Sequence, residues 1–361
     1  MRFRPSKSQE DLPSFWNLEG LLATWKVWHQ TDMKATLNHL LNYQTLDEPT
    51  AYQTLLGIGR GEFNASQIAS FLTVFALRGI TVEELTGFRK AMLDLLLPVD
   101  FSEFDAMDVC GTGGDGKDTF NVSTLSAFVV AGTGQKVAKQ GNHGVSSAVG
   151  SSTVLEYLGI KFTNDSDYLR RKMETAGICY LHAPLFHPAM KNVAPIRKEL
   201  GIKTFFNMLG PMINPSFTPK QMVGVFSLEL ARLYAYLYQQ SDMKYLIVHS
   251  LDGYDEVSLT GDFKIITAHN EQILVPADLG LKTLKPEDLF GGETLADSAA
   301  IFLNVLNDEA TSAQKEAVLA NAGLALFAAD STLSLTDAVA MARESLESKR
   351  ALAAFKTLIE E

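Results

Sequence analysis

The stretch from Asp108 to Thr124 constrains the fold more than any other part of this chain. It runs Asp-Val-Cys-Gly-Thr-Gly-Gly-Asp-Gly-Lys-Asp-Thr-Phe-Asn-Val-Ser-Thr and leads into an apolar run that indicates a helix. Glycines let backbone N–H groups converge on an anion, because they lack a Cβ and tolerate a positive φ. An anion at the start of the helix would also meet free N–H groups and the positive end of the helix dipole. The order strand, glycine turn, helix therefore predicts either a phosphate site or a purely structural turn.

Strand and helix patterns alternate from about residue 104 onward, which predicts an α/β fold with a mainly parallel central sheet covered by helices. The strands are expected at residues 104–110, 135–139, 178–182 and 245–250, and helices at 124–132 and 150–158. Roughly the last sixty residues return to helical periodicity, with Ser334 as an N-cap.

A smaller all-helical domain is expected before the sheet. The capping-box spacings Asn64–Gln67 and Thr81–Glu84 each precede an apolar periodic run, and Pro98 ends the last of these runs. The predicted organisation is an N-terminal extension (1–33), a helical domain (34–100, with 190–215 contributing) and an α/β domain (101–189 and 216–361).

Composition narrows the class of protein. With 361 residues the chain should form about two domains. A net charge of −11 argues against a broad nucleic-acid or anionic-membrane surface. Only two cysteines are present, which argues against a disulfide framework and fits a reducing compartment. No apolar run reaches the length of a membrane span and the basic N-terminus lacks a signal-peptide core, so we expect a cytoplasmic protein.

A second polar loop follows the strand expected at 135–139. The segment Lys139-Gln-Gly-Asn-His-Gly-Val-Ser-Ser147, with Gly150–Ser152 beyond it, supplies one cation, an amide and several hydroxyls that suit a phosphate and a sugar. A solvated loop would have the same composition. Two such loops after neighbouring strands would open at the carboxyl edge of the sheet, where α/β folds bind ligands.

Three further features could bind a ligand. Asp255 and Glu256 follow the strand expected at 245–250, and two carboxylates with diphosphate oxygens and waters make an ordinary magnesium site, although an acidic surface turn is the alternative. Arg197 could grip a carboxylate through two parallel hydrogen bonds, or could belong to a surface salt bridge. His187 could contact a ligand, cap a helix or pack in the core.

Together these motifs resemble the anthranilate phosphoribosyltransferase family, from near Met33 to the C-terminus. The matching stretches are residues 61–72, Gly111–Asp115, Asn121–Thr124, Lys139-x-Gly-Asn142, His187–Met190, Asn207–Pro211 and Asp255–Glu256. The family joins anthranilate to 5-phosphoribosyl 1-diphosphate (PRPP) and releases pyrophosphate with the help of Mg²⁺, in tryptophan biosynthesis.

The resemblance implies a role for individual residues. PRPP would be bound by Gly111, Gly114, Asp115, Thr119, Asn121, Val122, Ser123, Thr124, Lys139, Ser147 and Ser151. Anthranilate would meet Gly111, Asn142, His187, Arg197 and Pro211, and two Mg²⁺ ions would be held by Ser123, Asp255 and Glu256. It also implies a homodimer through the helical domain, whereas no residue is assigned as a general base.

The chain departs from the family at three positions. Gln140 and His143 stand where the family usually has histidine and arginine, and Thr153 stands where aspartate is common. Losing the arginine removes a permanent cation from the predicted site, so no substrate contact is assigned to position 143. None of these changes affects Arg197 or the acid pair.

Two other functions compete with this one. A pyrimidine nucleoside phosphorylase has the same general fold, but it needs neither a diphosphate-binding metal pair nor Arg197. A non-catalytic relative that binds nucleic acid should be basic and should lack the Gly-Thr-Gly-Gly-Asp loop, whereas this chain is acidic and has it.

Overall fold

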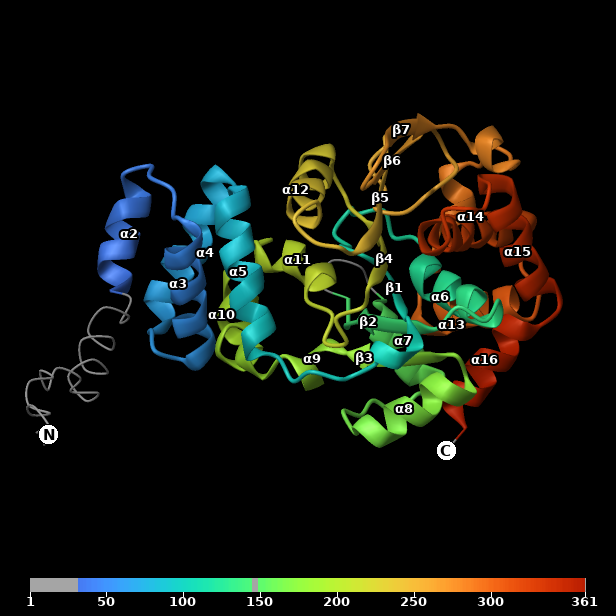
Figure 1. The fold of residues 1–361 in the computed structure, drawn as a ribbon, viewed down its shortest axis with the longest axis horizontal. Helices are drawn as coiled ribbons and strands as arrows, with labels where there is room; N and C mark the ends of the chain where they lie inside the picture. The colour runs from blue at the N-terminus through green and yellow to red at the C-terminus, as the bar shows by residue number, and fades with distance from the viewer. Residues whose placement is uncertain (1–31, 145–148, 361) are drawn as a thin grey trace, which may run out of the picture.

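The centre of the computed structural model, which describes residues 32–144 and 149–360, is a seven-stranded sheet with the order β3-β2-β1-β4-β5-β6-β7 (Figure 1). The strands are β1 (Met107–Gly111), β2 (Val137–Gly141), β3 (Ile178–His182), β4 (Lys220–Gly224), β5 (Lys244–Ser250), β6 (Phe263–Thr267) and β7 (Glu271–Leu274). The first five strands are parallel to their neighbours, and only β6 and β7 are antiparallel. The predicted mainly parallel α/β sheet is confirmed.

A bundle of helices lies at the opposite end of the molecule from the C-terminal helices (Figure 1). It contains α2 (Met33–Leu41), α3 (Glu48–Arg60), α4 (Ala65–Arg78) and α5 (Val82–Leu95). Both predicted capping boxes are formed: the Asn64 and Thr81 side chains each accept from the backbone N–H three residues on, and the side chain of that residue accepts from the N–H of the cap. Helix α5 ends at Leu95, ahead of Pro98, which lacks the N–H needed to continue it.

One face of the sheet is covered by α6 (Val122–Gly132), α13 (Leu295–Leu306), α14 (Ser312–Ala329), α15 (Leu335–Glu347) and α16 (Arg350–Ile359). Side chains alternate across a strand, so Met107 and Met222 join this aliphatic core, while Val223 points to the other face. Helix α6 is buried nearly all round because it lies between the sheet and α14 and α16.

The other face of the sheet shares its core with the helical bundle. Val223 and Ile247 pack in one cluster with α12 (Leu228–Tyr238), with α2–α5, and with the segment around Phe205. Aromatic rings dominate the centre of this cluster, where Phe88 stacks on Phe205 at a centroid distance of 4.5 Å. The bundle is therefore attached to the sheet through continuous apolar packing.

Short elements connect these parts. They are η1 (Ser102–Phe104), α7 (Ser151–Tyr157), α8 (Ser166–Thr175), α9 (Ala183–Phe186), η2 (Pro188–Asn192), α10 (Ala194–Leu200), α11 (Phe206–Leu209), η3 (Gly210–Met212), η4 (Pro276–Leu279) and η5 (Pro286–Leu289). The first strand begins later than residue 104, because η1 and the left-handed residue Asp105 (φ 46°) precede it.

Candidate active site

The carboxyl ends of the parallel strands meet at one edge of the sheet, and a cavity of about 290 Å³ opens there. One wall is made by the loops that follow β1, β2 and β5 and by the start of α6. The opposite wall is made by α10, α11 and η3. We refer to these as the rim wall and the helical wall.

The glycine loop after β1 folds back over the strand ends. Gly113, Gly114 and Gly116 have φ values of 63°, 82° and 73°, which glycine adopts without the strain that a side chain would cause. The Gly113 N–H donates to Asp255 Oδ2 at 2.6 Å, so the loop is joined directly to the segment after β5. Asp255 thus faces the Gly111–Asp115 turn.

The acid pair sits deep in the rim wall. Glu256 Oε1 accepts from the Ser123 N–H at 2.9 Å, at the start of α6, where the helix dipole favours a negative charge. Burial raises the pKa of both carboxyls, and repulsion from Glu256 raises that of Asp255 further. Each acid accepts a backbone N–H through one oxygen, so its second oxygen can serve another ligand.

Two glycines allow this approach. A Cβ at Gly224, at the end of β4, would lie 1.5 Å from the Asp255 carbonyl oxygen. A Cβ at Gly111 would lie 2.7 Å from Asp255 Oδ2. Both distances are shorter than a van der Waals contact, so Asp255 can occupy this position only beside glycine.

The donor set fits a divalent cation that is shared with a substrate. Asp115 Oδ2 is buried and has no hydrogen-bond partner among the described residues, and the Asp115 carboxylate is close enough to raise the pKa of Asp255 by repulsion. Among residues 32–144 and 149–360, no three His, Cys, Asp or Glu side chains form a ready-made metal centre. A hard cation would therefore need oxygens from a bound ligand as well as these carboxylates.

Lys139 is a buried cation in the middle of β2. Its Nζ donates to the Val109 carbonyl at 2.6 Å, and burial lowers its pKa while the charge of Asp108 opposes that shift. Asp108 is itself fully buried and accepts from the Gln140 N–H at 3.3 Å. Lys139 lines the cavity, so it brings a buried positive charge to the cavity wall, with the buried Asp108 behind it.

The helical wall carries a positive charge, opposite in sign to the charge of the acid pair. Arg197, on α10, is half-buried, and its Nη2 donates to Asn207 Oδ1 at 3.2 Å. Its guanidinium also lies 5.4 Å from the centroid of the Phe206 ring. Asn207 additionally accepts from the Thr204 N–H at 3.0 Å, so its amide is held in the orientation that receives Arg197.

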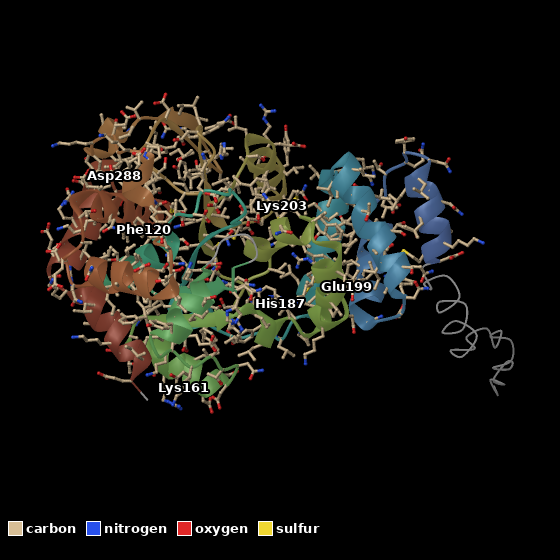
Figure 2. All side chains as sticks on the ribbon, turned by 180° about the vertical axis from the view of Figure 1, so that it is seen from behind. Phe120, Lys161, His187, Glu199, Lys203 and Asp288 are labelled. Carbon is tan, nitrogen blue, oxygen red and sulfur yellow. The ribbon has the colours of Figure 1, made fainter. Side chains whose placement is uncertain are left out.

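The two walls touch at the mouth of the cavity. Lys203, on the loop between α10 and α11, donates from Nζ to the Gly114 carbonyl at 2.5 Å. Figure 2 shows Lys203 and His187 in the middle of the molecule, between the bundle and the sheet, with Phe120 on the sheet side.

His187 lies behind the cavity surface, with Gln140 in front of it. Gln140 Nε2 lies 3.0 Å from His187 Nε2, and His187 Nδ1 has no partner among the described residues. Burial lowers the pKa of His187 to about 4. Gln140 therefore replaces a second ring at this position with a neutral amide that lines the cavity.

The other two departures from the family, His143 and Thr153, lie next to each other. His143 Nδ1 lies 3.2 Å from Thr153 Oγ1, so these two residues are hydrogen-bonded to each other. Ser151 lies beside this contact, and its hydroxyl is 2.8 Å from the Tyr180 hydroxyl.

Most of the predicted site residues share the one cavity. Its lining includes Gly111, Asp115, Thr119, Asn121, Ser123, Thr124, Lys139, Asn142, Ser151, Arg197, Pro211, Asp255 and Glu256. Gly114, Val122 and His187 do not line it: Gly114 contacts Lys203, Val122 is buried in the core, and His187 is covered by Gln140. Ser147 lies outside the described residues.

Several residues that line the cavity are missing from the predicted set. Asn207 and Phe206, which hold Arg197, are the most informative, together with Thr112 and Gln140. The Asn-Met-Leu-Gly-Pro motif was the available signal for Asn207, but spacing alone does not show that its amide turns toward Arg197.

Comparisons with known proteins agree with this geometry. Residues 103–352 match the glycosyl transferase family a/b domain, and residues 34–95 match the helical bundle domain of the same family. The anthranilate phosphoribosyltransferase of Cytophaga hutchinsonii is 55% identical over 327 residues, covering 91% of this chain and 100% of the relative.

Solved structures show the same similarity. The anthranilate phosphoribosyltransferase of Thermus thermophilus superposes with a TM-score of 0.84 at 34% identity, covering 90% of this chain and 98% of that one. The enzyme of Saccharomyces cerevisiae in complex with PRPP and Mg gives a TM-score of 0.83 at 28% identity, covering 91% and 96%. Helices of the described residues include none long and apolar enough to span a membrane.

Proposed function

The chain belongs to the anthranilate phosphoribosyltransferase family, and we propose that it carries out the family's reaction in the cavity between the rim wall and the helical wall. The enzyme transfers the 5-phosphoribosyl group of PRPP to the amine of anthranilate and releases pyrophosphate, a step of tryptophan biosynthesis. The observation that supports this location is the opposition of an acid pair, at Asp255 and Glu256, to a half-buried guanidinium at Arg197 in one cavity.

PRPP is assigned to the rim wall. The glycine loop and the start of α6 offer backbone N–H groups and the Ser123 and Thr124 hydroxyls, while Lys139 supplies a buried cation. Thr119, Asn121 and Ser151 line the same wall and suit the ribose and the 5-phosphate. Gly114, Val122 and Ser147 remain predicted contacts of this substrate.

Two Mg²⁺ ions are assigned to Ser123, Asp255 and Glu256. The Asp115 oxygen and the second carboxylate oxygens of the acid pair are hard donors of the kind that Mg²⁺ prefers. When bound, the metal supplies positive charge that stabilises the leaving diphosphate. Burial first, and then repulsion from Glu256 and Asp115, raise the pKa of Asp255, and a bound cation would offset both effects.

Anthranilate is assigned to the helical wall, with its carboxylate on Arg197. Asn207 and Phe206 hold the guanidinium, so its fork is oriented before the substrate arrives. Asn142 and Gly111 would lie on the amine side, and Pro211 would pack on the ring. His187 would act through Gln140, which separates it from the cavity.

Orientation and electrostatics then account for the chemistry. The ribose C1–O bond breaks with its electron pair going to pyrophosphate, and the amine nitrogen forms the new bond at C1 as positive charge develops on the ribose. The amine proton passes to the substrate's own carboxylate or to water. No side chain that lines the cavity is assigned as a general base.

The other two functions are not favoured. The curated relatives that match over nine-tenths of the chain are anthranilate phosphoribosyltransferases. A phosphorylase would also leave the paired acids and Arg197 without a role.

Assembly and compartment are proposals of the same kind. We infer a homodimer through the helical bundle, where Leu41, Tyr43 and Leu77 are exposed apolar side chains. We also infer a cytoplasmic location, since Cys110 and Cys179 are buried and unpaired.

The direct test mixes the protein with PRPP, Mg²⁺ and anthranilate and follows the loss of anthranilate fluorescence. The proposal expects the loss to require all three components and to yield one pyrophosphate per anthranilate. Phosphorolysis of uridine or thymidine, or tight binding of nucleic acid in physiological salt, would contradict it.

A further inference from the structure

The helical wall contains a segment whose backbone carbonyls accept hydrogen bonds from side chains that lie outside the cavity lining. Residues 206–212 form α11 and η3, and four of them, Phe206, Asn207, Gly210 and Pro211, line the active-site cavity. Carbonyl groups at the end of such short helices have no intrahelical partner and must be satisfied by other donors. Here three of those carbonyls, at Met208, Pro211 and Met212, accept from side chains of other elements.

Three donors and one supporting hydroxyl make these contacts. Tyr234 OH donates to the Met208 carbonyl at 2.5 Å, Gln221 Nε2 to the Pro211 carbonyl at 2.6 Å, and Arg89 Nε to the Met212 carbonyl at 3.0 Å. Tyr238 OH donates to Gln221 Oε1 at 2.6 Å and so orients the amide. We call this set the carbonyl clamp; its members are Arg89, Gln221, Tyr234 and Tyr238.

Most of the clamp is buried, and it lies on the far side of the wall from the substrates. Tyr234, Tyr238 and Gln221 are 0%, 1% and 2% exposed. A small cavity of about 40 Å³ opens between Arg89, Gln221 and Tyr238, with Pro211 between it and the active-site cavity. None of the four clamp residues lines the active-site cavity, so they act on it through their neighbours. All four contact the backbone of the wall or orient a residue that does, and Gln221 Nε2 also lies 3.5 Å from Sγ of Cys110, which lines the cavity.

The clamp also joins the two domains. Arg89 comes from α5 of the helical bundle, whereas Gln221 lies on β4 and the tyrosines lie on α12. Gln221 Nε2 is in addition 3.3 Å from Asp108 Oδ2, the buried carboxylate beside Lys139 and Gln140. The position of the wall is therefore set by the bundle, by the central strand and by the floor of the cavity.

We propose that the carbonyl clamp is a set of positioning residues that holds the Phe206–Met212 backbone in the shape that binds the aromatic acid. This inference rests on the proposed function, because it assigns the clamped wall to anthranilate. A ligand wall held by four side chains from two domains needs little reordering when substrate binds. The lower free-energy cost of ordering raises the affinity for the substrate on that wall and not for the other substrate.

The test is Tyr238→Phe, which removes one hydroxyl and leaves the ring. Loss of one buried hydrogen bond should raise KM for anthranilate by about five- to tenfold, with KM for PRPP changed by less than about twofold. The matched control is Tyr245→Phe: its ring lies 5.4 Å from that of Tyr238, but its buried hydroxyl has no hydrogen-bond partner in the described residues. The control should leave both KM values unchanged.

A second variant covers the case in which Tyr238→Phe does not fold. Arg89→Lys keeps the charge but loses the Nε donor to Met212, and should raise KM for anthranilate by about two- to fivefold. In a Gln221→Met background, Tyr238→Phe should raise KM for anthranilate little further, since the Tyr238 hydroxyl acts through the Gln221 amide. Equal changes in both KM values, no change in either, or an equal effect of Tyr245→Phe would overturn the clamp. A wild-type protein inactive on anthranilate would instead overturn the proposed function.

Discussion

The rim wall and the helical wall are built by different means, although they enclose one cavity. In the rim wall, the backbone N–H groups of Gly113 and Ser123 hold the acids Asp255 and Glu256, at positions that follow from strand ends and a helix start. In the helical wall, the polar group is the long side chain of Arg197, held by Asn207 and Phe206 from a neighbouring short helix.

The difference concerns which substitutions each wall tolerates. A backbone-built site depends on main-chain geometry, so its weak points are its glycines and the acids that accept from its N–H groups. A side-chain-built site depends on the packing behind each side chain, so its weak points lie outside the cavity. A substitution in one wall should therefore leave the substrate on the other wall nearly unaffected.

The largest effect is expected from the acid pair. Asp255→Asn combined with Glu256→Ala should lower kcat/KM by at least about 10³-fold, because the charge that holds Mg²⁺ against the leaving diphosphate is lost. Turnover is measured by anthranilate fluorescence across a range of Mg²⁺ concentrations. Asp252→Asn, in the same loop but outside the cavity lining, is the control. Near-normal activity of the double variant at low Mg²⁺ would contradict the metal assignment.

An intermediate effect is expected from the helical wall. Arg197→Ala should raise KM for anthranilate by about 100-fold and leave KM for PRPP nearly unchanged, since a charge-assisted bidentate contact is removed. Arg197→Lys should recover only part of the loss, because lysine lacks the planar fork. Lys198→Ala changes the same charge at the next, exposed position and should have no effect. A parallel rise in KM for PRPP would mean that Arg197 serves both substrates.

The smallest effect is expected from His187, which contacts Gln140 behind the surface of the cavity. Burial lowers its pKa from 6.5 to about 4. Between these two values, the imidazole is protonated in the unfolded chain and neutral in the native protein. The free energy of unfolding should therefore fall by about 2 kcal/mol as the pH is lowered from about 7 to about 5. Denaturant unfolding at both pH values measures this, with His187→Asn as the variant that should lose that share of the pH dependence. An unchanged pH dependence in the variant would show that the ring titrates freely.

Local pattern predicted much of the fold. The strand at Ile178–His182 was placed correctly to the residue, and the capping boxes at Asn64 and Thr81 marked the true starts of α4 and α5. Strands β4, β6 and β7 were not expected. Lys220–Gly224 follows a proline-punctuated segment and is short, so only its pairing between β1 and β5 shows that it is the central strand.

The candidate site, like the fold, has one part that was predicted from sequence and one that was not. The residues of the rim wall are contiguous motifs, and Gly111, Asp115, Asn121 and Lys139 were all predicted from sequence and all line the cavity. The supporting contacts are not contiguous: Asn207 meets Arg197 from ten residues away, and Asp255 approaches Gly113 across 142 residues. Such contacts depend on tertiary packing, which no local pattern encodes.

The approach of Asp255 to Gly111 and Gly224 bears on laboratory evolution of this enzyme. A library aimed at new aromatic acceptors would gain nothing by randomising the codon for Gly224, because every side chain at this position collides with the main chain of the acid loop. A side chain at Gly111 would instead displace the Asp255 carboxylate. Diversity is better directed to positions facing the acceptor ring, where a variant can change which amine is accepted while the diphosphate end stays in register.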